Sequence, residues 1–136
     1  MRPETDRWGL VIVRMLVGAI FIAHGSPKLL AARRNPSLPD FAASLHRIGL
    51  NPGLFWAWAV TIVESFGGVC LFLGVFTRAA AALIGAEMIV AGLKVNGLRG
   101  FYWTHGGWEV PLVFAVLCAV LVLTTPGRRS AGQARR

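Results

Sequence analysis

Acidic residues are scarce in this 136-residue chain, and charge of either sign is sparse. Six aspartates and glutamates stand against fourteen lysines and arginines, which leaves a net charge of +8 with only 15% of residues charged. A soluble domain normally carries about 25% charged residues. The composition is 55% hydrophobic, with a mean hydropathy of +0.61. The apolar residues lie in long runs, which argues against a large soluble core and indicates a membrane protein.

Cysteine is nearly absent. Cys70 and Cys118 are the only two, they lie far apart in separate apolar runs, and neither belongs to a CxxC pair. This spacing argues against a redox or metal role, and no metal site is expected. Both cysteines are interpreted as small buried hydrophobic residues.

Basic residues do not alternate with aromatic ones, as they do on surfaces that bind nucleic acid. The arginines cluster instead at the ends of the apolar runs, at Arg2, Arg7, Arg33, Arg34, Arg78, Arg128, Arg129, Arg135 and Arg136. Flanks of this kind anchor helices at the membrane edge and set their orientation. The expected surroundings are a lipid bilayer, with no nucleic acid as partner.

Four apolar runs predict membrane-spanning helices, because a backbone in lipid must satisfy its hydrogen bonds internally. They cover about Trp8–Leu30, Leu54–Phe76, Arg78–Leu93 and Trp108–Thr125. Turn residues separate them, and Pro126-Gly127 ends the last. The predicted fold is all-α, an integral membrane four-helix bundle formed by residues 1–136 as a single domain. The charged start, Met1–Arg7, is expected to lead into a retained helix rather than a cleaved signal peptide.

The link between the first two runs is long for a helical bundle, and a short helix is predicted inside it at Phe41–Ile48, capped by Asp40. Phe41, Leu45 and Ile48 share one face through their i, i+4, i+7 spacing. Such a helix would lie at the membrane interface. It would either fasten the loop at the surface, which is the favoured interpretation, or form a lid over the mouth of the bundle.

An even number of spans places both termini on one side of the membrane. That side would hold seven arginines, namely Arg2, Arg7, Arg78, Arg128, Arg129, Arg135 and Arg136. The other side would hold Arg33, Arg34, Arg47 and Arg99, with Lys28 and Lys94 at helix ends. Positive charge is enriched on the cytoplasmic side of membrane proteins, so the count favours cytoplasmic termini by a narrow margin.

Ionisable residues inside the apolar runs are the main functional signal. Glu64 is the only charged residue of Leu54–Phe76, and Glu87 lies within the next run. A carboxylate near the centre of a spanning helix costs roughly 2.5–3.5 kcal/mol of insertion free energy. Such groups mark either a functional site or an internal polar pairing.

The first run carries cations on a stripe of small residues. Steps of four and three residues align Arg14, Gly18, Phe21, Gly25 and Lys28 on one face, with His24 facing nearly the same way. Glycines on the stripe let another helix or a flat ligand approach the backbone closely. Lys28 and Arg14 could alternatively reach the membrane interface with their long side chains.

These groups allow two interpretations. They form either a purely structural network of ion pairs or an acid–base or ligand site. The predicted centre is Glu64 with Lys28 and His24, near one end of the bundle, and Arg78 or Glu87 completes the polar network. Arg14 is a further candidate. Glu109, in the first turn of the fourth run, either complements the helix dipole or belongs to the site mouth, and no catalytic residue is assigned.

Four blocks of the sequence resemble the DoxX family of membrane proteins. The first block comprises Arg14, Ile20-Phe21, His24-Gly25 and Lys28-Leu29, and the most specific one is Glu64-x-x-Gly67-Gly68-x-x-Leu71-x-x-Gly74-x-x-Thr77-Arg78-Ala79-Ala80. The third block resembles the start of the family's fourth helix and comprises Gly100-Phe101 with Gly107-x-Glu109-x-Pro111-Leu112. The fourth block resembles the family's C-terminal segment and is Pro126-Gly127-Arg128-Arg129-Ser130. The chain departs from the family at Ala131-Gly132, where Leu-Asp is typical.

The resemblance implies a four-helix protein of the bacterial inner membrane. The members after which the family is named are linked to thiosulfate- and quinol-related oxidoreductases. Mycobacterial members are linked to a membrane complex that handles oxidative and thiol stress. The first hypothesis is therefore a small subunit or accessory of a membrane oxidoreductase, with a quinone as candidate cofactor. The alternative is a non-catalytic scaffold, or a passage for protons or small solutes. Candidate partners are an oxidoreductase and a second copy of the chain.

Overall fold

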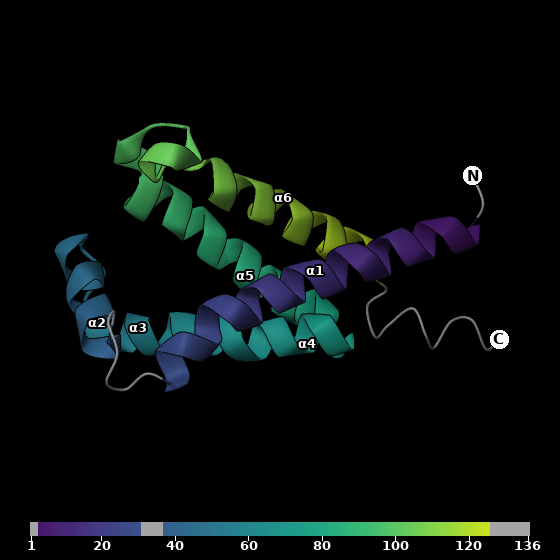
Figure 1. Ribbon diagram of the computed structural model, residues 1–136, viewed down its shortest axis with the longest axis horizontal. Coiled ribbons are helices and arrows are strands. Elements are labelled where there is room, and N and C mark those ends of the chain that lie inside the picture. The colour runs from purple at the N-terminus through teal and green to yellow at the C-terminus, as the bar shows by residue number, and fades with distance from the viewer. Residues whose placement is uncertain (1–2, 31–36, 126–136) are drawn as a thin grey trace.

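The computed structural model describes residues 3–30 and 37–125, all of whose regular elements are helical (Figure 1). In chain order they are α1 (Pro3–Leu30), α2 (Leu38–Arg47), α3 (Gly53–Ile62), η1 (Val63–Gly67), α4 (Gly68–Leu73), α5 (Thr77–Val90), η2 (Ala91–Asn96), η3 (Gly97–Arg99), η4 (Trp103–His105) and α6 (Glu109–Thr124). The predicted turn at Pro36, the pair Arg33-Arg34 and the basic tail 126–136 lie outside the described residues.

The prediction of four apolar helices is confirmed. Three continuous helical stretches are long and apolar enough to cross a membrane, namely Arg7–Leu30, Gly53–Leu73 and Thr77–Asn96. The fourth, α6, is apolar but has only 16 residues. The second stretch ends at Leu73, three residues earlier than predicted, because Gly74 takes up a left-handed conformation with φ +77°. The third continues to Asn96 as the π-helix η2.

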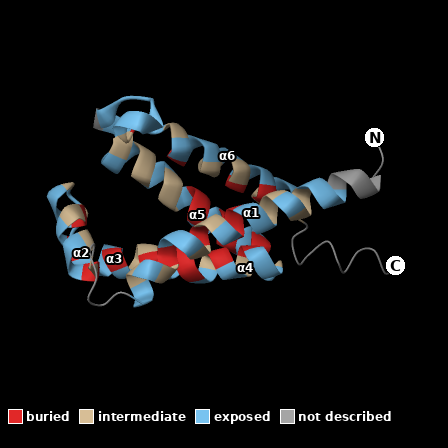
Figure 2. Ribbon diagram, viewed as in Figure 1, coloured by how far each residue is buried: buried red, intermediate tan, exposed pale blue. Residues whose placement is uncertain are grey.

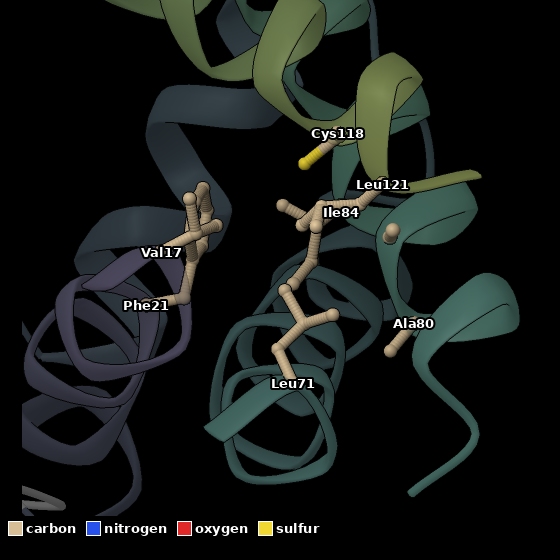
Figure 3. Close-up of a cluster of buried hydrophobic side chains, with 8 residues drawn as sticks. Val17, Phe21, Leu71, Ala80, Ile84, Cys118 and Leu121 are labelled. Atoms are coloured by element: carbon tan, nitrogen blue, oxygen red, sulfur yellow. The ribbon is translucent and has the colours of Figure 1, made fainter. Parts of the chain in front are cut away.

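The core of the bundle lies where α1, α4, α5 and α6 meet. Figure 3 shows Val17 and Phe21 of α1 facing Leu71, Ile84 and Cys118 across this centre. Cys118 is fully buried, as predicted for a small hydrophobic residue, and Cys70 is partly buried. Figure 2 shows burial concentrated along these inner faces, while the outward faces are exposed. Since those exposed faces are rich in large apolar side chains, lipid rather than water is their suitable surrounding.

Close backbone contact joins α1 to the second helical stretch. A methyl group built on Gly18 would lie 2.6 Å from the backbone nitrogen of Phe72 and 2.7 Å from the carbonyl oxygen of Gly68. A methyl group on Gly25 would lie 2.6 Å from the backbone nitrogen of Ser65. The predicted glycine stripe is therefore a helix-packing seam, in which only glycine allows the two backbones to approach this closely.

The short helix α2 forms where it was predicted, but Asp40 is not its cap. Ser37 is the N-cap residue, and its hydroxyl accepts a hydrogen bond from the Asp40 backbone nitrogen at 3.3 Å. The Asp40 carboxylate in turn accepts from the Ser37 backbone nitrogen at 3.2 Å, which completes a capping box. The prediction was wrong by three residues because Pro39 fits the first helical turn, so the helix begins before Asp40.

The apolar face of α2 packs as its periodicity predicted. Leu38, Ala42 and Leu45 are buried against Ala57 of α3, while Phe41 and Ile48 are partly buried beside them. His46 and Arg47 are exposed on the other side. The helix is thereby fixed to the start of the second helical stretch.

Replacing Ser37 with alanine should destabilise α2 by about 1 kcal/mol, because the Asp40 backbone N–H loses the acceptor that the Ser37 hydroxyl provides.

The Ser37 hydroxyl and backbone N–H hold the pKa of Asp40 below its ordinary value of 3.8. A lowered folded-state pKa stabilises the folded form above pH 3.8, and this contribution is lost as the pH falls through the folded value. Hydrogen-exchange protection of amides 38–47 should therefore fall at acid pH in the wild type. The protection of these amides should change less with pH in Asp40→Asn. Equal protection in the wild type and in Ser37→Ala at neutral pH would contradict the capping role of Ser37.

Candidate functional site

The centre of the candidate site is an ion pair between Lys28 and Glu64. Lys28 lies in the last turn of α1, and its ammonium group donates a hydrogen bond to the Glu64 carboxylate of η1. The Glu64 side chain is 8% exposed and that of Lys28 is 19% exposed. Among the described residues it is the one ion pair present, and it joins two of the candidate residues named from the sequence.

A π-helical turn positions Glu64. The second helical stretch widens from α-helix to π-helix at Val63–Gly67 and returns to α-helix at Gly68. Such a turn accommodates one extra residue and is frequent at functional sites. Here it coincides with the burial of two successive polar residues, Glu64 and Ser65. The Ser65 hydroxyl is buried against Gly25 and has no hydrogen-bond partner among the described residues.

Glu87 brings a second carboxyl group to the pair from α5. It lies near enough to Glu64 and Lys28 for their charges to act on it, and its Oε2 atom is buried without a hydrogen-bond partner in the described part of the chain. Two carboxyl groups and one ammonium group thus lie in one apolar part of the bundle. With both carboxyl groups ionised the cluster would carry a net negative charge, which is costly in apolar surroundings.

Phe41 of α2 covers the ammonium group. The Lys28 nitrogen lies 4.6 Å from the centre of the Phe41 ring, a cation–π arrangement. From its spacing in the sequence, Phe41 was predicted only as part of the apolar face of its helix, and Ser65 was not predicted as a site residue. The spacing within one helix predicts that Phe41 faces inward, but it does not predict that Lys28 lies beneath the ring.

Four of the predicted site residues lie away from this cluster. His24 is exposed, with its Nδ1 atom 3.0 Å from the Ile20 carbonyl oxygen. Arg78 is exposed in the first turn of α5, and Arg14 packs against Gly74 near the opposite end of the second helical stretch. Glu109 accepts a hydrogen bond from the Trp103 backbone nitrogen at 3.1 Å, which ties it to the loop before α6. The structure therefore brings together Lys28, Glu64 and Glu87 out of the seven candidates.

An apolar cavity of about 430 Å³ lies between α5, η2 and α6. Met88, Gly92, Trp108 and Pro111 are among the residues that line it. Met88 directly follows Glu87, so the cavity begins one residue along α5 from the polar cluster. Trp108 contributes to the cavity wall, and Tyr102 and Trp103 nearby are exposed, as aromatic side chains at a membrane interface commonly are.

Comparisons with known proteins agree with this architecture. A family model described as DoxX matches residues 9–97, which run from within α1 past the end of η2 and contain all three members of the cluster. An uncharacterised protein of Haemophilus influenzae is 29% identical over 121 residues, which cover 87% of this chain and 84% of that protein. An uncharacterised membrane protein of Mycobacterium tuberculosis is 30% identical over 105 residues, 73% of this chain and 60% of that protein. No solved structure matches significantly.

Proposed function

The chain belongs to the DoxX family of membrane proteins, and we infer from its polar cluster that it serves a membrane oxidoreductase system as a small subunit or accessory. The observation that supports this proposal is the convergence of Lys28, Glu64 and Glu87 from three helical stretches within an apolar bundle. Ionisable groups at such positions usually serve a ligand or a proton path. The proposed ligand is a quinone headgroup, with a small thiol or sulfur compound as the other candidate of the same site.

The residues present suit a quinone headgroup. A quinone carries electrons together with protons, and its carbonyl oxygens accept hydrogen bonds. The buried Glu87 Oε2 atom has no partner among the described residues, so a protonated Glu87 has a donor to offer. Lys28 supplies a fixed positive charge, and the carboxyl pair can hold or release a proton beside the ligand. The apolar cavity that begins at Met88 offers surroundings suited to a hydrocarbon tail.

A second candidate function rests on a different observation. Lys28 and Glu64 already satisfy each other, and Phe41 covers the ammonium group. A purely structural ion pair of this kind suits a non-catalytic scaffold that holds a partner protein. The same carboxyl groups would also suit a passage for protons. Ligand content separates the two candidates, because a scaffold or a proton passage needs no bound quinone.

Glu87→Gln is the variant that best tests the quinone proposal, because it removes the ionisable group and leaves the Lys28–Glu64 ion pair intact. We expect the variant to fold and to lose bound quinone about tenfold, which corresponds to roughly 1.4 kcal/mol, because the glutamine amide is a weaker donor than a carboxylic acid and cannot pass a proton to the quinone. The measurement is quinone per protein, by mass spectrometry of extracts of protein purified in mild detergent.

Glu109→Gln is the matched control, since its amide oxygen can still accept from the Trp103 nitrogen. It should retain quinone like the wild type. Equal quinone content in wild type, Glu87→Gln and Glu109→Gln would contradict quinone binding at the cluster. Co-purification of an oxidoreductase in all three would then favour the scaffold.

We place the protein in the bacterial inner membrane with cytoplasmic termini, on the support of the basic flanks. In that orientation the Lys28–Glu64 pair lies towards the outer side of the membrane, since α1 starts on the cytoplasmic side and Lys28 ends it. A partner oxidoreductase would then meet the cluster from the side that carries α2. A second copy of the chain is a further candidate partner.

A further inference from the structure

A second cavity, of about 550 Å³, lies at the opposite end of the bundle from the Lys28–Glu64 pair. It is bounded by the first turns of α1, the turn between α4 and α5, and the last turn of α6 (Figure 1). Arg7 and Arg14 line it from α1. They are seven residues apart, so they lie on one face of the helix, roughly 10 Å from each other along its axis. The proposed quinone site does not include this cavity.

Arg14 forms no ion pair with any acidic residue whose side chain the structure describes. Its guanidinium group packs against Gly74, where an added methyl group would lie 2.6 Å from Cζ and 2.8 Å from Nη2. Its Nε atom is buried and has no hydrogen-bond partner among the described residues. No acidic residue lines the cavity in the part of the chain whose side chains are described. A buried guanidinium donor left unpaired is costly, which makes an external acceptor favourable.

The walls of the cavity offer further groups suited to an anion. Thr77 is buried at the first position of α5. Thr124, the last residue of α6, also lines the cavity, but its hydroxyl donates to the Val120 carbonyl oxygen at 2.7 Å. The first backbone N–H groups of α5 have no acceptor within the helix, and the helix dipole is positive at that end. The remaining lining includes apolar side chains such as Leu10 and Leu121. Guanidinium groups, hydroxyl groups and a helix N-terminus together are typical of phosphate recognition.

We propose that this cavity binds a phosphate group, with Arg14 as the principal ligand and Arg7 and Thr77 beside it. The position favours a phospholipid headgroup as the source of the phosphate. The apolar stretch of α1 begins at Arg7 and α6 ends at Thr124, so the cavity lies at the depth where headgroups meet the hydrocarbon. Basic pockets between helices on the cytoplasmic side are suited to anionic lipids. Free inorganic phosphate shares the same chemistry and is the other source to be tested.

The experiment compares lipid retention by native mass spectrometry of the full chain in detergent, titrated with phosphatidylglycerol or phosphatidylcholine. Both lipids carry a phosphate, but only phosphatidylglycerol is anionic overall. The wild type should bind phosphatidylglycerol about tenfold more tightly than phosphatidylcholine. Arg14→Gln should lose most of this preference, and Arg14→Lys should keep part of it, because lysine preserves the charge but not the two-pronged geometry.

Arg78→Gln is the matched control, since Arg78 is an exposed arginine at the same end of the bundle and does not line the cavity. It should bind both lipids within about twofold of the wild type. An equal loss of preference in Arg78→Gln and Arg14→Gln would show general surface attraction and overturn the proposal. Equal binding of the two lipids by the wild type, unchanged in Arg14→Gln, would overturn the lipid as the source of the phosphate.

A thermal-shift titration with sodium phosphate against sodium chloride at equal ionic strength tests free phosphate as the source. Stabilisation of the wild type by phosphate, absent in Arg14→Gln, would support the same site with a soluble ligand. An absence of both lipid preference and phosphate stabilisation would overturn the proposal altogether. If Arg14→Gln does not fold, Thr77→Val replaces it as a variant of similar volume without the hydroxyl group. Its preference for phosphatidylglycerol should fall at least threefold, and an unchanged preference would overturn the assignment.

Discussion

Replacing Glu64 with glutamine should lower the free energy of unfolding by about 2–3 kcal/mol, because it breaks the one ion pair among the described residues. Removing one partner of a buried ion pair typically costs roughly 3–5 kcal/mol, because the other charge remains buried and unpaired. The loss should fall below that range here, since Lys28 is 19% exposed in the last turn of α1 and Glu87 lies nearby as a substitute partner. Reversible unfolding in mixed detergent micelles measures the change.

The double variant Glu64→Gln with Lys28→Met separates stability from function. Removal of both charges should recover most of the stability that the single variant lost, a coupling of about 1.5–2 kcal/mol in a double-mutant cycle. It should not recover quinone, because neither the charge nor the proton-exchanging group returns. A double variant that regained both stability and quinone would contradict the site and leave only a structural ion pair. A Glu64→Gln protein with wild-type stability and quinone content would contradict both the ligand site and the structural ion pair.

Replacing Gly18 with alanine should destabilise the bundle by about 3 kcal/mol, because it overpacks the seam between α1 and α4. The added methyl group would meet the backbone nitrogen of Phe72 and the carbonyl oxygen of Gly68, at 2.6 and 2.7 Å. Backbone atoms cannot rotate away as a flexible side chain can, so α1 and α4 would have to separate. Overpacking of this kind costs roughly 1–3 kcal/mol and occasionally more. Thermal unfolding in detergent, followed by circular dichroism, measures the loss.

Gly9→Ala is the matched control on the same helix, because nothing lies within 4 Å of a methyl group built there. It should stabilise α1 by up to about 1 kcal/mol, since alanine has the higher helix propensity. Gly25→Ala should resemble Gly18→Ala in its loss of stability. It should also weaken quinone binding, because the clash at Ser65 displaces the turn that carries Glu64. Equal stability of Gly18→Ala and Gly9→Ala would show that α1 and α4 do not approach as closely as the structure has them.

The sequence by itself determined the class of the protein, its helices and the identity of its buried ionisable groups. Long apolar runs and the glycines and prolines between them are local features, and a backbone in lipid has few alternatives to a helix. Glu64, Glu87 and Lys28 were predicted as site residues because charge in an apolar run is costly wherever the helix packs. The glycine stripe on α1 was likewise predicted, since positions on one helical face follow from spacing alone.

The tertiary structure alone decided which of these groups meet. Helical periodicity placed His24 close to Lys28 on the α1 face, yet the packing of Gly25 against Ser65 leaves His24 exposed. Arg14 lies on the same stripe as Lys28 but about 20 Å away along α1, so it faces a different cavity. The π-helical turn at Glu64 and the position of Phe41 over Lys28 depend on contacts between helices distant in sequence. Such contacts depend on how the helices pack, and spacing within one helix does not specify them.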